Sequence, residues 1–563
     1  MIKDLEVLET DVLVIGGGGA GCWAALKASE HDLDVTLINQ YTFGKSGTTI
    51  VAMITYQALM GELGIHPEDD EEMFFNDLVR GGAYLGDQNL VEILVRNSRQ
   101  TVLDYERLGV KWDRSGDKYD QKQLPGMTIP RGCFEDHRTG LSIQRALVKA
   151  VRGRRNIRYL ERKAVKLLKG DGRVAGVLTW DIPSGKFTKI SAKSVVMATG
   201  GAGRLYKVTS MPEDARGSGT ALALRTGATL TDVEFQLFFP TTLPYPESLK
   251  GLVVPRGTTV PLGAKILNGK GERFMHRYYP EAEYATRDKS SIAIMLEVKK
   301  GNGTPHGGVF MDFSRVENLL EKYPTSFKDF KLAGINLPEE WLEVCPGHHF
   351  SIGGIRINEF CETSLPGLYA AGEAAGNLHG ANRVGGAALP ECAVFGQIAG
   401  RYAAIFSTFK GRVEIPAAEV EQGVERINNL RTRGEKGEYS PVKVMRELQQ
   451  VMYDNVGVVR SEGSLKEALS KIEALKDRVE GLRINPSRTY NNELVDAVDL
   501  QEMLLLGEAI TKAALLRTES RGSHHRLDFP TEDDRNWRRH TVVHMVDENL
   551  HFSTSPVVVT RGL

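Results

Sequence analysis

The sequence predicts an α/β fold with an inserted α+β domain and a C-terminal helical domain, and three observations predict it. Two apolar runs end in glycine-rich turns, at 11–22 and at 194–203. The stretch 233–347 is richer in aromatic residues and proline and has few such turns. Residues from about 413 to 520 repeat Leu, Ala, Glu and Lys with the period of long helices.

The first glycine turn has the layout of a phosphate-binding unit. Val12 to Ile15 is an apolar run that leads into Gly16-x-Gly18-x-x-Gly21, and a helix-compatible segment follows. Gly16 permits the tight turn, Gly18 lets the backbone approach a pyrophosphate, and Gly21 lets helix and strand pack closely. The helix N-terminus attracts the phosphate charge. The unit therefore predicts a dinucleotide bound to a Rossmann-type domain.

The second strand and the second turn indicate which dinucleotide is bound. In many NAD-binding folds an acid after the second strand binds the ribose, but Asn39 and Gln40 are neutral here. Two separated glycine turns suit FAD, because the second lets the returning chain pass close to the cofactor. The residues of that second turn are Ala198, Thr199, Gly200 and Gly201.

The remaining segments follow in order. Helical periodicity marks 71–108 and 142–152, and 157–180 is strand-like. Glycine turns return at 353–354, 367–375 and 379–389, so the segment after the insertion should rejoin the first body. We therefore expect an FAD-binding domain at 1–232 and 348–410, a capping domain over the substrate at 233–347, a helical domain at 411–530 and a charged, then strand-like tail at 531–563.

Composition excludes several function classes. With 71 basic and 72 acidic residues the net charge is −1, which argues against nucleic-acid or polybasic membrane binding. No apolar run reaches about 18 residues, and the first residues show no export signal. The five cysteines form no C-x-x-C pair, so no disulfide scaffold, metal site or iron–sulfur cluster of the chain's own is expected. We expect a cytoplasmic protein that reaches a membrane only through partner subunits.

Further motifs occur in one order along most of the chain. They are Gly81-Gly82 with Asp87-Gln88, Thr139-Gly140, GERFM at 271–275, TRD at 286–288, HFSIGGI at 349–355, GLYAAGE at 367–373, HGANRVGG at 379–386, RTESRG at 517–522 and DD-x-NW at 533–537. With the two glycine turns, this set resembles the flavoprotein subunits of succinate dehydrogenase and fumarate reductase, with L-aspartate oxidase as a relative.

The resemblance implies FAD and the hydrogenation or dehydrogenation of a C=C bond next to a carboxylate. Flavin N5 then exchanges hydride with one carbon, and an arginine, here Arg287, exchanges a proton with the other. The pKa of arginine exceeds about 12, so a relay needs a neighbouring carboxylate, which Asp288 offers in sequence. The alternative for these two residues is a structural Arg–Asp pair.

The resemblance also assigns the binding residues. His349 and Arg383 match residues that grip a substrate carboxylate, Arg383 as a planar fork and His349 as a charged or donating group that polarises it. His349 is otherwise a turn histidine, whose role His348 could share. The implied cofactor-binding residues are Gly16, Gly18, Gly21, Asn39, Ser46, Thr48, Ala198, Thr199, Gly200, Gly201, Glu373, Ala388 and Leu389. For Glu373 the alternative is an acid favoured by a helix N-terminus.

Three departures from the family pattern concern chemistry. Gly47 stands where the family dehydrogenases carry the histidine that bonds covalently to FAD, so noncovalent FAD is expected. Phe239 replaces the histidine that binds the second carboxylate, and the family's Thr-Glu-Gly-x-Arg-Gly-Glu-Gly segment is absent between Pro240 and Asn268. A substrate with one carboxylate, or with an apolar or thioester end, fits these changes better, because an unpaired charge in a dry pocket is expensive. Arg256 or Lys265 could replace the lost ligands.

Three functions remain open on this reading. The first is a flavoenzyme that reduces or forms an activated C=C bond in a small carboxylate or acyl substrate. The second is L-aspartate oxidase, which the missing ligands disfavour equally. The third is an electron-transfer subunit with no organic substrate, which the altered substrate wall favours. Since the chain lacks clustered cysteines and a further NAD(P)-binding unit, an iron–sulfur partner subunit is expected.

Overall fold

The computed structural model describes residues 5–52, 55–136, 138–322 and 324–562. Its centre is a sheet of strand order β7-β2-β1-β10-β9-β8, with the short β17 also pairing with β10. The strands are β1 (Leu5–Ile15), β2 (Val35–Asn39), β7 (Ile157–Glu161), β8 (Lys163–Gly170), β9 (Arg173–Trp180), β10 (Phe187–Met197) and β17 (Leu368–Ala370). β1, β2, β7, β10 and β17 run parallel, whereas β8, β9 and β10 form an antiparallel meander.

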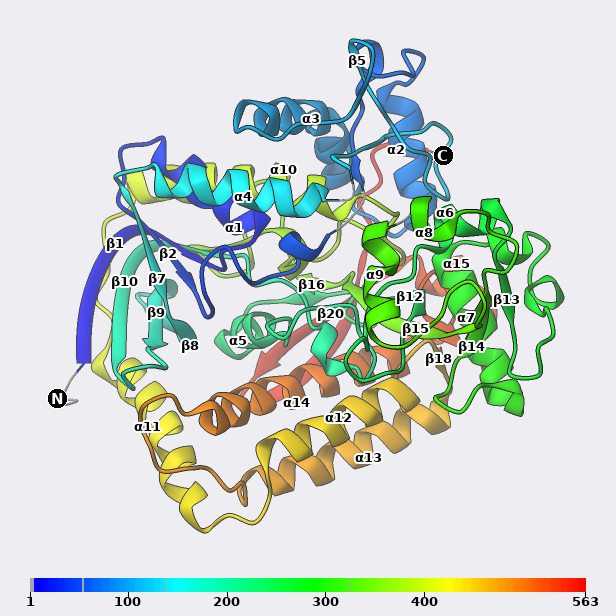
Figure 1. Cartoon of the computed structure of the whole chain (residues 1–563). Coiled ribbons are helices and arrows are strands. Elements are labelled where there is room, and N and C mark those ends of the chain that lie inside the picture. The colour runs from blue at the N-terminus through cyan, green and yellow to red at the C-terminus, as the bar shows by residue number, and fades with distance from the viewer. Residues whose placement is uncertain (1–4, 53–54, 137, 323, 563) are drawn as a thin grey trace.

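Helices cover this sheet and explain its apolar strands (Figure 1). α1 (Gly19–Ser29), α4 (Thr139–Arg152) and α10 (Ala388–Phe409) pack together on one face. Strands buried between layers read as continuous apolar runs, as the end of β1 does. Gly400 lets α10 lie directly on α1, because a Cβ there would meet the Ala24 carbonyl oxygen at 2.2 Å. Beyond them α2 (Glu71–Gly81) and α3 (Gln88–Arg107) occupy the segment of predicted helical periodicity.

The inserted segment has a hydrophobic core of its own. Its antiparallel sheet has the order β12-β15-β14-β13, and the cluster of buried side chains within it runs from Leu243 to Val344. The elements are β12 (Gln236–Thr242), α6 (Arg256–Thr259), β13 (Lys265–Leu267), α7 (Arg287–Glu297), β14 (Val309–Asp312), α8 (Leu319–Lys322), α9 (Pro324–Leu332) and β15 (Leu342–Ser351). β12 and β15 connect this domain to the nucleotide-binding body, so residues on both strands reach the junction.

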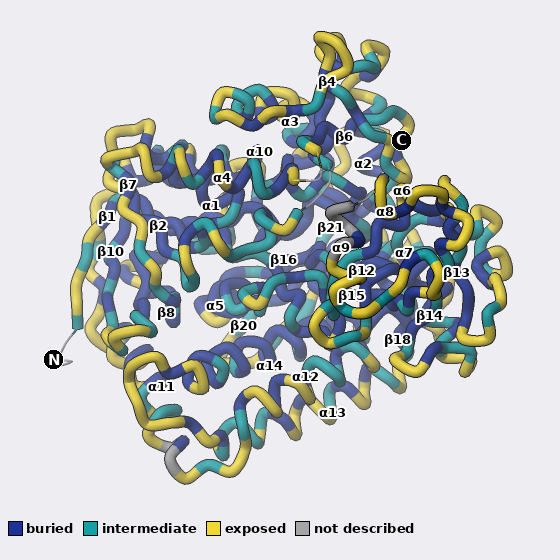
Figure 2. Tube along the Cα trace, viewed as in Figure 1, coloured by how far each residue is buried: buried dark blue, intermediate teal, exposed yellow. Residues whose placement is uncertain are grey.

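The C-terminal helices pack on the body through one continuous core. They are α11 (Ala417–Arg433), α12 (Pro441–Asn455), α13 (Glu462–Val479) and α14 (Asn492–Leu516). α14 is buried on nearly all sides, since it lies between α12, α13 and α5 (Ser218–Thr226). Figure 2 shows this inner helix buried, while α13 exposes its outer face.

The last residues complete a sheet of the body. β20 (Arg539–Val546) and β21 (Asn549–Pro556) form a hairpin beside β11 (Leu230–Thr231) and β16 (Gly354–Ile355). The strand-like character predicted for this segment is confirmed. The chain then crosses to α3, where Gln88 accepts hydrogen bonds from the backbone of Thr560 and Arg561. Within the described part of the chain, no helix has the length and apolar character needed to cross a membrane.

Candidate active site

A cavity lies where the two glycine turns meet, between the ends of β1 and β10 and the start of α1. Of the predicted cofactor-binding residues, Gly16, Gly18, Asn39, Thr48, Ala198, Thr199, Gly200 and Glu373 line it. The cavity lining does not include the other predicted residues, which are Gly21, Ser46, Gly201, Ala388 and Leu389. Its lining also includes Gly47, Thr49, Asp214, Ala215, Ala371 and Cys392, which sequence reasoning did not assign to the cofactor.

The glycines of the first turn meet different demands. A Cβ on Gly21 would lie 1.8 Å from the Gly16 carbonyl oxygen, and a Cβ on Gly16 would lie 2.1 Å from that of Ala198. Gly21 thus lets α1 pack against the first glycine turn, and Gly16 lets the second glycine turn pack against it. Gly18 differs, because its Cβ would meet only the Thr49 hydroxyl, at 3.6 Å. Space therefore remains at Gly18 for a ligand to approach the backbone.

Asn39 shows why this position is neutral. Its amide oxygen accepts from the Gly17 N–H at 3.0 Å, and its amide nitrogen donates to the Tyr41 carbonyl at 2.7 Å and to the Ser46 hydroxyl at 3.0 Å. A carboxylate could not donate these last two bonds. Asn39 thus joins the glycine turn to the 41–48 segment. Ser46 contacts that turn indirectly, by accepting a hydrogen bond from the Asn39 side chain.

The cavity fits a dinucleotide that carries a pyrophosphate. The N-terminus of α1 opens on it, with no acidic residue in the first turn of the helix. The hydroxyl of Thr199 is buried without a hydrogen-bond partner among the described residues, and a Cβ on Gly200 would touch nothing within 4 Å. Glu373 closes the far end: it accepts from the Ser351 N–H at 3.0 Å, and burial raises its pKa to about 7.

Arg287 and Arg383 bring positive charge to the junction of the body and the inserted domain. Arg287 begins α7, and its guanidinium lies against Gly385, whose Cβ would be 3.2 Å from Nη2. No hydrogen bond or ion pair joins Arg287 to any described residue. Burial and the charges of Arg383 and Arg256 lower the pKa of Arg287 to about 9. The side chain is thus a recessed cation that no carboxylate neutralises.

Arg383 is a second cation of the same kind. It is 5% exposed, and its guanidinium lies 4.5 Å from the centre of the Phe350 ring. Its one hydrogen bond to a described residue is from Nη1 to the Val384 carbonyl, at 3.0 Å, and its Nε–H is buried without a partner. Burial lowers its pKa to about 10 although Glu373 and Glu391 lie near. Most of its donor fork is free for an anion.

His349 stands beside these arginines as a neutral imidazole. Its Nδ1 is 2.7 Å from the Ser210 hydroxyl, which leaves Nε2 free. Burial, followed by the charges of Arg383 and Arg287, holds its pKa well below the usual range. A charged His349, one of two options the sequence leaves, is therefore disfavoured before an anion binds. It can still donate from Nε2 if Ser210 donates to Nδ1.

His348 points to the opposite face of β15 and shares no role with His349. It stacks on Tyr206 with ring centres 4.8 Å apart, and its Nε2 is 2.7 Å from the Gln236 amide oxygen. Burial lowers its pKa to about 3. The alternation of side chains along a strand separates these neighbours.

Asp288 does not pair with Arg287, so the structure shows neither the predicted relay contact nor a structural ion pair. Its Oδ1 is buried without a hydrogen-bond partner among the described residues, and burial raises its pKa. Adjacent residues on a helix do not face each other. This is why adjacency in sequence did not produce a contact at the start of α7.

Phe239 forms the wall where the family has a histidine. Its ring centre lies 5.1 Å from the Arg287 guanidinium carbon and 5.2 Å from the centre of the His349 ring. Arg256, one suggested replacement ligand, instead donates to the carbonyls of Glu283 and Ala285 at 2.9 and 2.7 Å. Lys265, the other, lies on β13, the far strand of the inserted sheet. Arg256 is thus occupied by backbone carbonyls, and Phe239 itself offers no hydrogen-bond donor.

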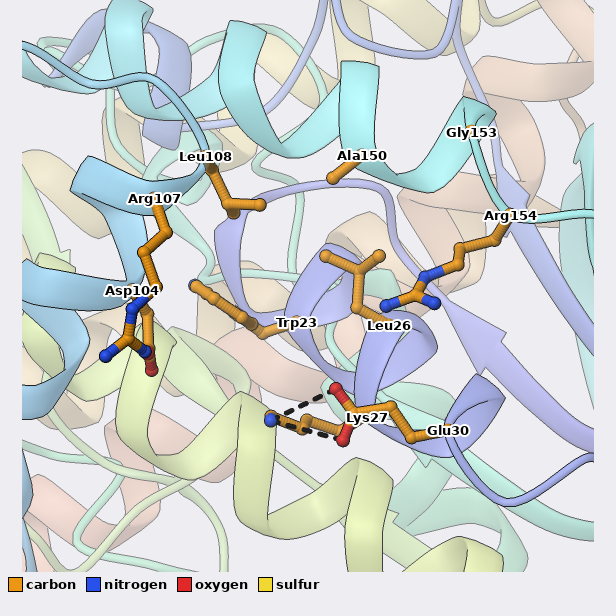
Figure 3. A pocket seen from close by; sticks show the side chains of 10 residues that line it. All are labelled: Trp23, Leu26, Lys27, Glu30, Asp104, Arg107, Leu108, Ala150, Gly153 and Arg154. Carbon is orange, nitrogen blue, oxygen red and sulfur yellow. Dashed lines mark hydrogen bonds and ion pairs between the residues drawn. The ribbon is translucent and has the colours of Figure 1, made fainter.

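A second cavity, of about 450 Å³, lies on the surface between α1, α3 and α4 (Figure 3). Trp23, Leu26, Leu108 and Ala150 form its apolar lining. The ion pairs Lys27–Glu30 and Asp104–Arg107 stand at its edge. None of the predicted site residues lines it.

Comparison with known proteins agrees with this geometry. Residues 11–389 match the family described as FAD binding domain, and residues 445–562 match the family described as fumarate reductase flavoprotein C-term. The chain is 38% identical over 538 residues to one of the subunits of the fumarate reductase (CoM/CoB) of Methanothermobacter marburgensis, covering 95% of this chain and 97% of that protein. It is 32% identical over 581 residues to the fumarate reductase flavoprotein subunit of Mycobacterium tuberculosis, covering 98% and 97%.

Solved structures show the same fold over the whole length. Sdh1 of Mycobacterium smegmatis, in complex with UQ1, superposes with a TM-score of 0.91 at 34% identity, covering 99% of this chain and 95% of that one. The flavoprotein of E. coli quinol fumarate reductase gives 0.90 at 28% identity, covering 99% and 98%. The predicted fold class and FAD as the cofactor are thereby confirmed. The chain belongs to the family of fumarate reductase and succinate dehydrogenase flavoprotein subunits, FAD-dependent oxidoreductases that act on CH–CH groups.

Proposed function

We propose that this flavoprotein reduces or forms a C=C bond next to a single carboxylate, with Arg383, His349 and Arg287 on the substrate side. The observation that carries the proposal is the pair of recessed cations, Arg287 and Arg383, which have no carboxylate partner among the described residues. Unpaired buried charge is costly. Arg383 is buried and Arg287 is partly buried, and an anion that binds between them best explains two such charges.

Arg383 and His349 would hold the carboxylate. Arg383 offers a planar fork whose donors are almost all free, and bidentate binding of a carboxylate uses that geometry. His349 donates from Nε2 when Ser210 donates to Nδ1. Both bonds draw electron density from the conjugated C=C bond, which favours addition of hydride at the far carbon.

Arg287 would exchange the proton. FAD, when bound, accepts or supplies the hydride. The pKa of Arg287, about 9, lies below that of an ordinary arginine, so less free energy is needed to remove its proton at pH 7. The burial and the two neighbouring guanidinium groups that lower this pKa therefore turn an unsuitable acid into a usable relay.

Phe239 restricts the substrate class. Its ring covers the faces of Arg287 and His349 on the side where the family binds a second carboxylate, and it offers no donor. A substrate with a methyl, alkyl or thioester group at that end would contact the ring favourably. The same feature favours the second candidate function, an electron-transfer subunit without an organic substrate.

A redox partner completes the proposal. The relatives are named as subunits, and no group of three or more possible metal ligands occurs among the described residues of this chain. We infer that electrons pass to or from an iron–sulfur subunit, through which the protein could also associate with a membrane. Purification from the native source should retain a cysteine-rich protein, and a lone chain with full NADH- or oxygen-coupled turnover would contradict this.

One experiment tests the substrate side. The purified flavoprotein is reduced without oxygen and mixed with crotonate, fumarate and an enoyl thioester, and flavin reoxidation is followed by absorbance. We expect crotonate to reoxidise the flavin faster than fumarate does, and this reoxidation to be lost in Arg383→Met. Faster reoxidation by fumarate would contradict the assignment of a single carboxylate. If none reoxidises the flavin while an iron–sulfur partner does, the electron-transfer candidate replaces this proposal.

A further inference from the structure

Arg383 lies in a segment that no regular element holds. The chain from Gly376 to Ala387 is irregular and joins a short 3-10 turn (Gly372–Ala374) to α10. The local sequence therefore does not determine where the guanidinium points. Contacts from distant segments must do so, and they occur on both sides of Arg383.

On the N-terminal side, Ser523 holds the carbonyl of Ala381, two residues before Arg383. The Ser523 hydroxyl and its own N–H both donate to this oxygen at 2.9 Å, while the Ala381 N–H donates to the Gly82 carbonyl at 2.9 Å. The position of Ser523 is itself fixed by its surroundings. Its loop is fixed by buried ion pairs of Arg517 with Glu234 at 2.7 Å and of Arg521 with Glu519 at 2.8 Å.

On the C-terminal side, Gln57 holds the two residues that follow Val384. Its side-chain nitrogen donates to the Gly385 carbonyl at 2.7 Å, and its backbone N–H donates to the Gly386 carbonyl at 3.1 Å. Gln57 is fully buried, and its amide oxygen has no hydrogen-bond partner among the described residues. The Arg287 guanidinium lies against this same Gly385.

We propose that Gln57 and Ser523 are positioning residues that fix the Arg383 loop from both ends and thereby aim its guanidinium at the substrate carboxylate. The inference rests on the proposed function of Arg383. The Gln57 amide satisfies the carbonyl of the buried Gly385 while its own oxygen stays without a partner among the described residues. The bond ties Gln57 to the residue against which the Arg287 guanidinium lies.

The chain contains a matched control for Gln57. Gln144 is also buried, its nitrogen donates to the Gly17 carbonyl at 2.9 Å, and its amide oxygen likewise has no partner in the described structure. The same arrangement therefore supports the nucleotide turn at 17 and the substrate loop at 385. Removing each amide should affect one ligand and spare the other.

The experiment compares Gln57→Met, Ser523→Ala, Gln144→Met and Arg383→Met as FAD-loaded proteins. Crotonate, and separately fumarate, is titrated into the oxidised form while the flavin spectrum is followed, and kcat and KM are measured by anaerobic reoxidation of the reduced flavin. FAD affinity and the unfolding midpoint are measured in parallel. We expect Gln57→Met and Ser523→Ala each to raise the Kd or KM for the probe by about 5- to 50-fold, with a smaller change in kcat and unchanged FAD affinity. Gln144→Met should weaken FAD but, once saturated, bind the probe normally.

The outcomes separate the two levels of inference. If Arg383→Met leaves probe binding unchanged, the proposed function fails first. If Arg383→Met abolishes binding but Gln57→Met and Ser523→Ala only lower the unfolding midpoint, the two residues are structural and this inference is wrong. Should Gln57→Met not fold, Ser523→Ala alone decides, because it removes one hydroxyl and leaves the backbone bond to Ala381.

Discussion

Phe239→His should change which acids the enzyme accepts. In the structure the centre of the Phe239 ring lies 5.1 Å from the Arg287 guanidinium carbon and 5.2 Å from the centre of the His349 ring. A histidine there would supply an N–H donor to a second carboxylate. Burial beside Arg287 would keep it neutral, as burial, followed by the charges of two arginines, does for His349. A hydrogen bond to a charged group contributes about 1.5–3 kcal/mol, so the gain for a dicarboxylate should be about 10- to 150-fold.

The assay uses fumarate and crotonate, which differ only in a carboxylate and a methyl group at one end. The ratio of their kcat/KM values, measured by anaerobic reoxidation of the reduced flavin, should rise toward fumarate by the factor above. Phe239→Leu is the control, because it removes the ring without adding a donor. It should slow both acids to a similar degree through loss of the contact with Arg287, which contributes about 1–2 kcal/mol. A ratio that is unchanged in Phe239→His would refute the assignment of this wall.

Three further predictions follow from the site. Since Gly47 offers no imidazole, acid precipitation should release yellow flavin into the supernatant, and flavin retained in the pellet would exclude noncovalent FAD. Arg287→Met should lower kcat by about 10²-fold or more with unchanged FAD content; wild-type turnover would exclude the relay. His349 stays neutral in the fold but not when unfolded, so its contribution to stability is present above pH 6.5 and declines as the pH falls below it. The kcat/KM profiles of the wild type and His349→Gln should therefore be parallel between pH 6 and 8, and a step near 6.5 in the wild type alone would show that His349 titrates.

The glycine turn illustrates what local sequence can predict. The contact between Gly16 and Gly21 is local, because the two residues are only five positions apart. A Cβ on Gly21 would lie 1.8 Å from the Gly16 carbonyl oxygen, so the spacing of the motif predicts where glycine is required. The residues at which helices begin and end were harder to predict from the sequence. The helical periodicity at 71–108 belongs to two helices, because the segment at Gly82–Asp87 turns with Ala83 and Tyr84 at positive φ.

The electrostatics of the substrate side were not readable from the sequence. The motifs named Arg287, His349 and Arg383, but whether the two arginines are paired depends on carboxylates that are distant along the chain. Asp288, the acid adjacent to Arg287, turned out to face elsewhere, since successive side chains on a helix point in different directions. The neutral state of His349 likewise follows from burial beside two arginines, which no local pattern encodes.

By itself, the sequence determined the Rossmann-type body, FAD, the family and the departures at Gly47 and Phe239, because each of these depends on residue type and short-range spacing. Tertiary structure alone decided that Arg287 and Arg383 lack carboxylate partners among the described residues and that Arg256 donates to backbone carbonyls of the inserted domain. It alone brought Gln57 and Ser523 to either side of Arg383. The Gln57 and Ser523 contacts join residues that are 328 and 142 positions apart along the chain, and only the closing of the fold brings them within hydrogen-bond distance.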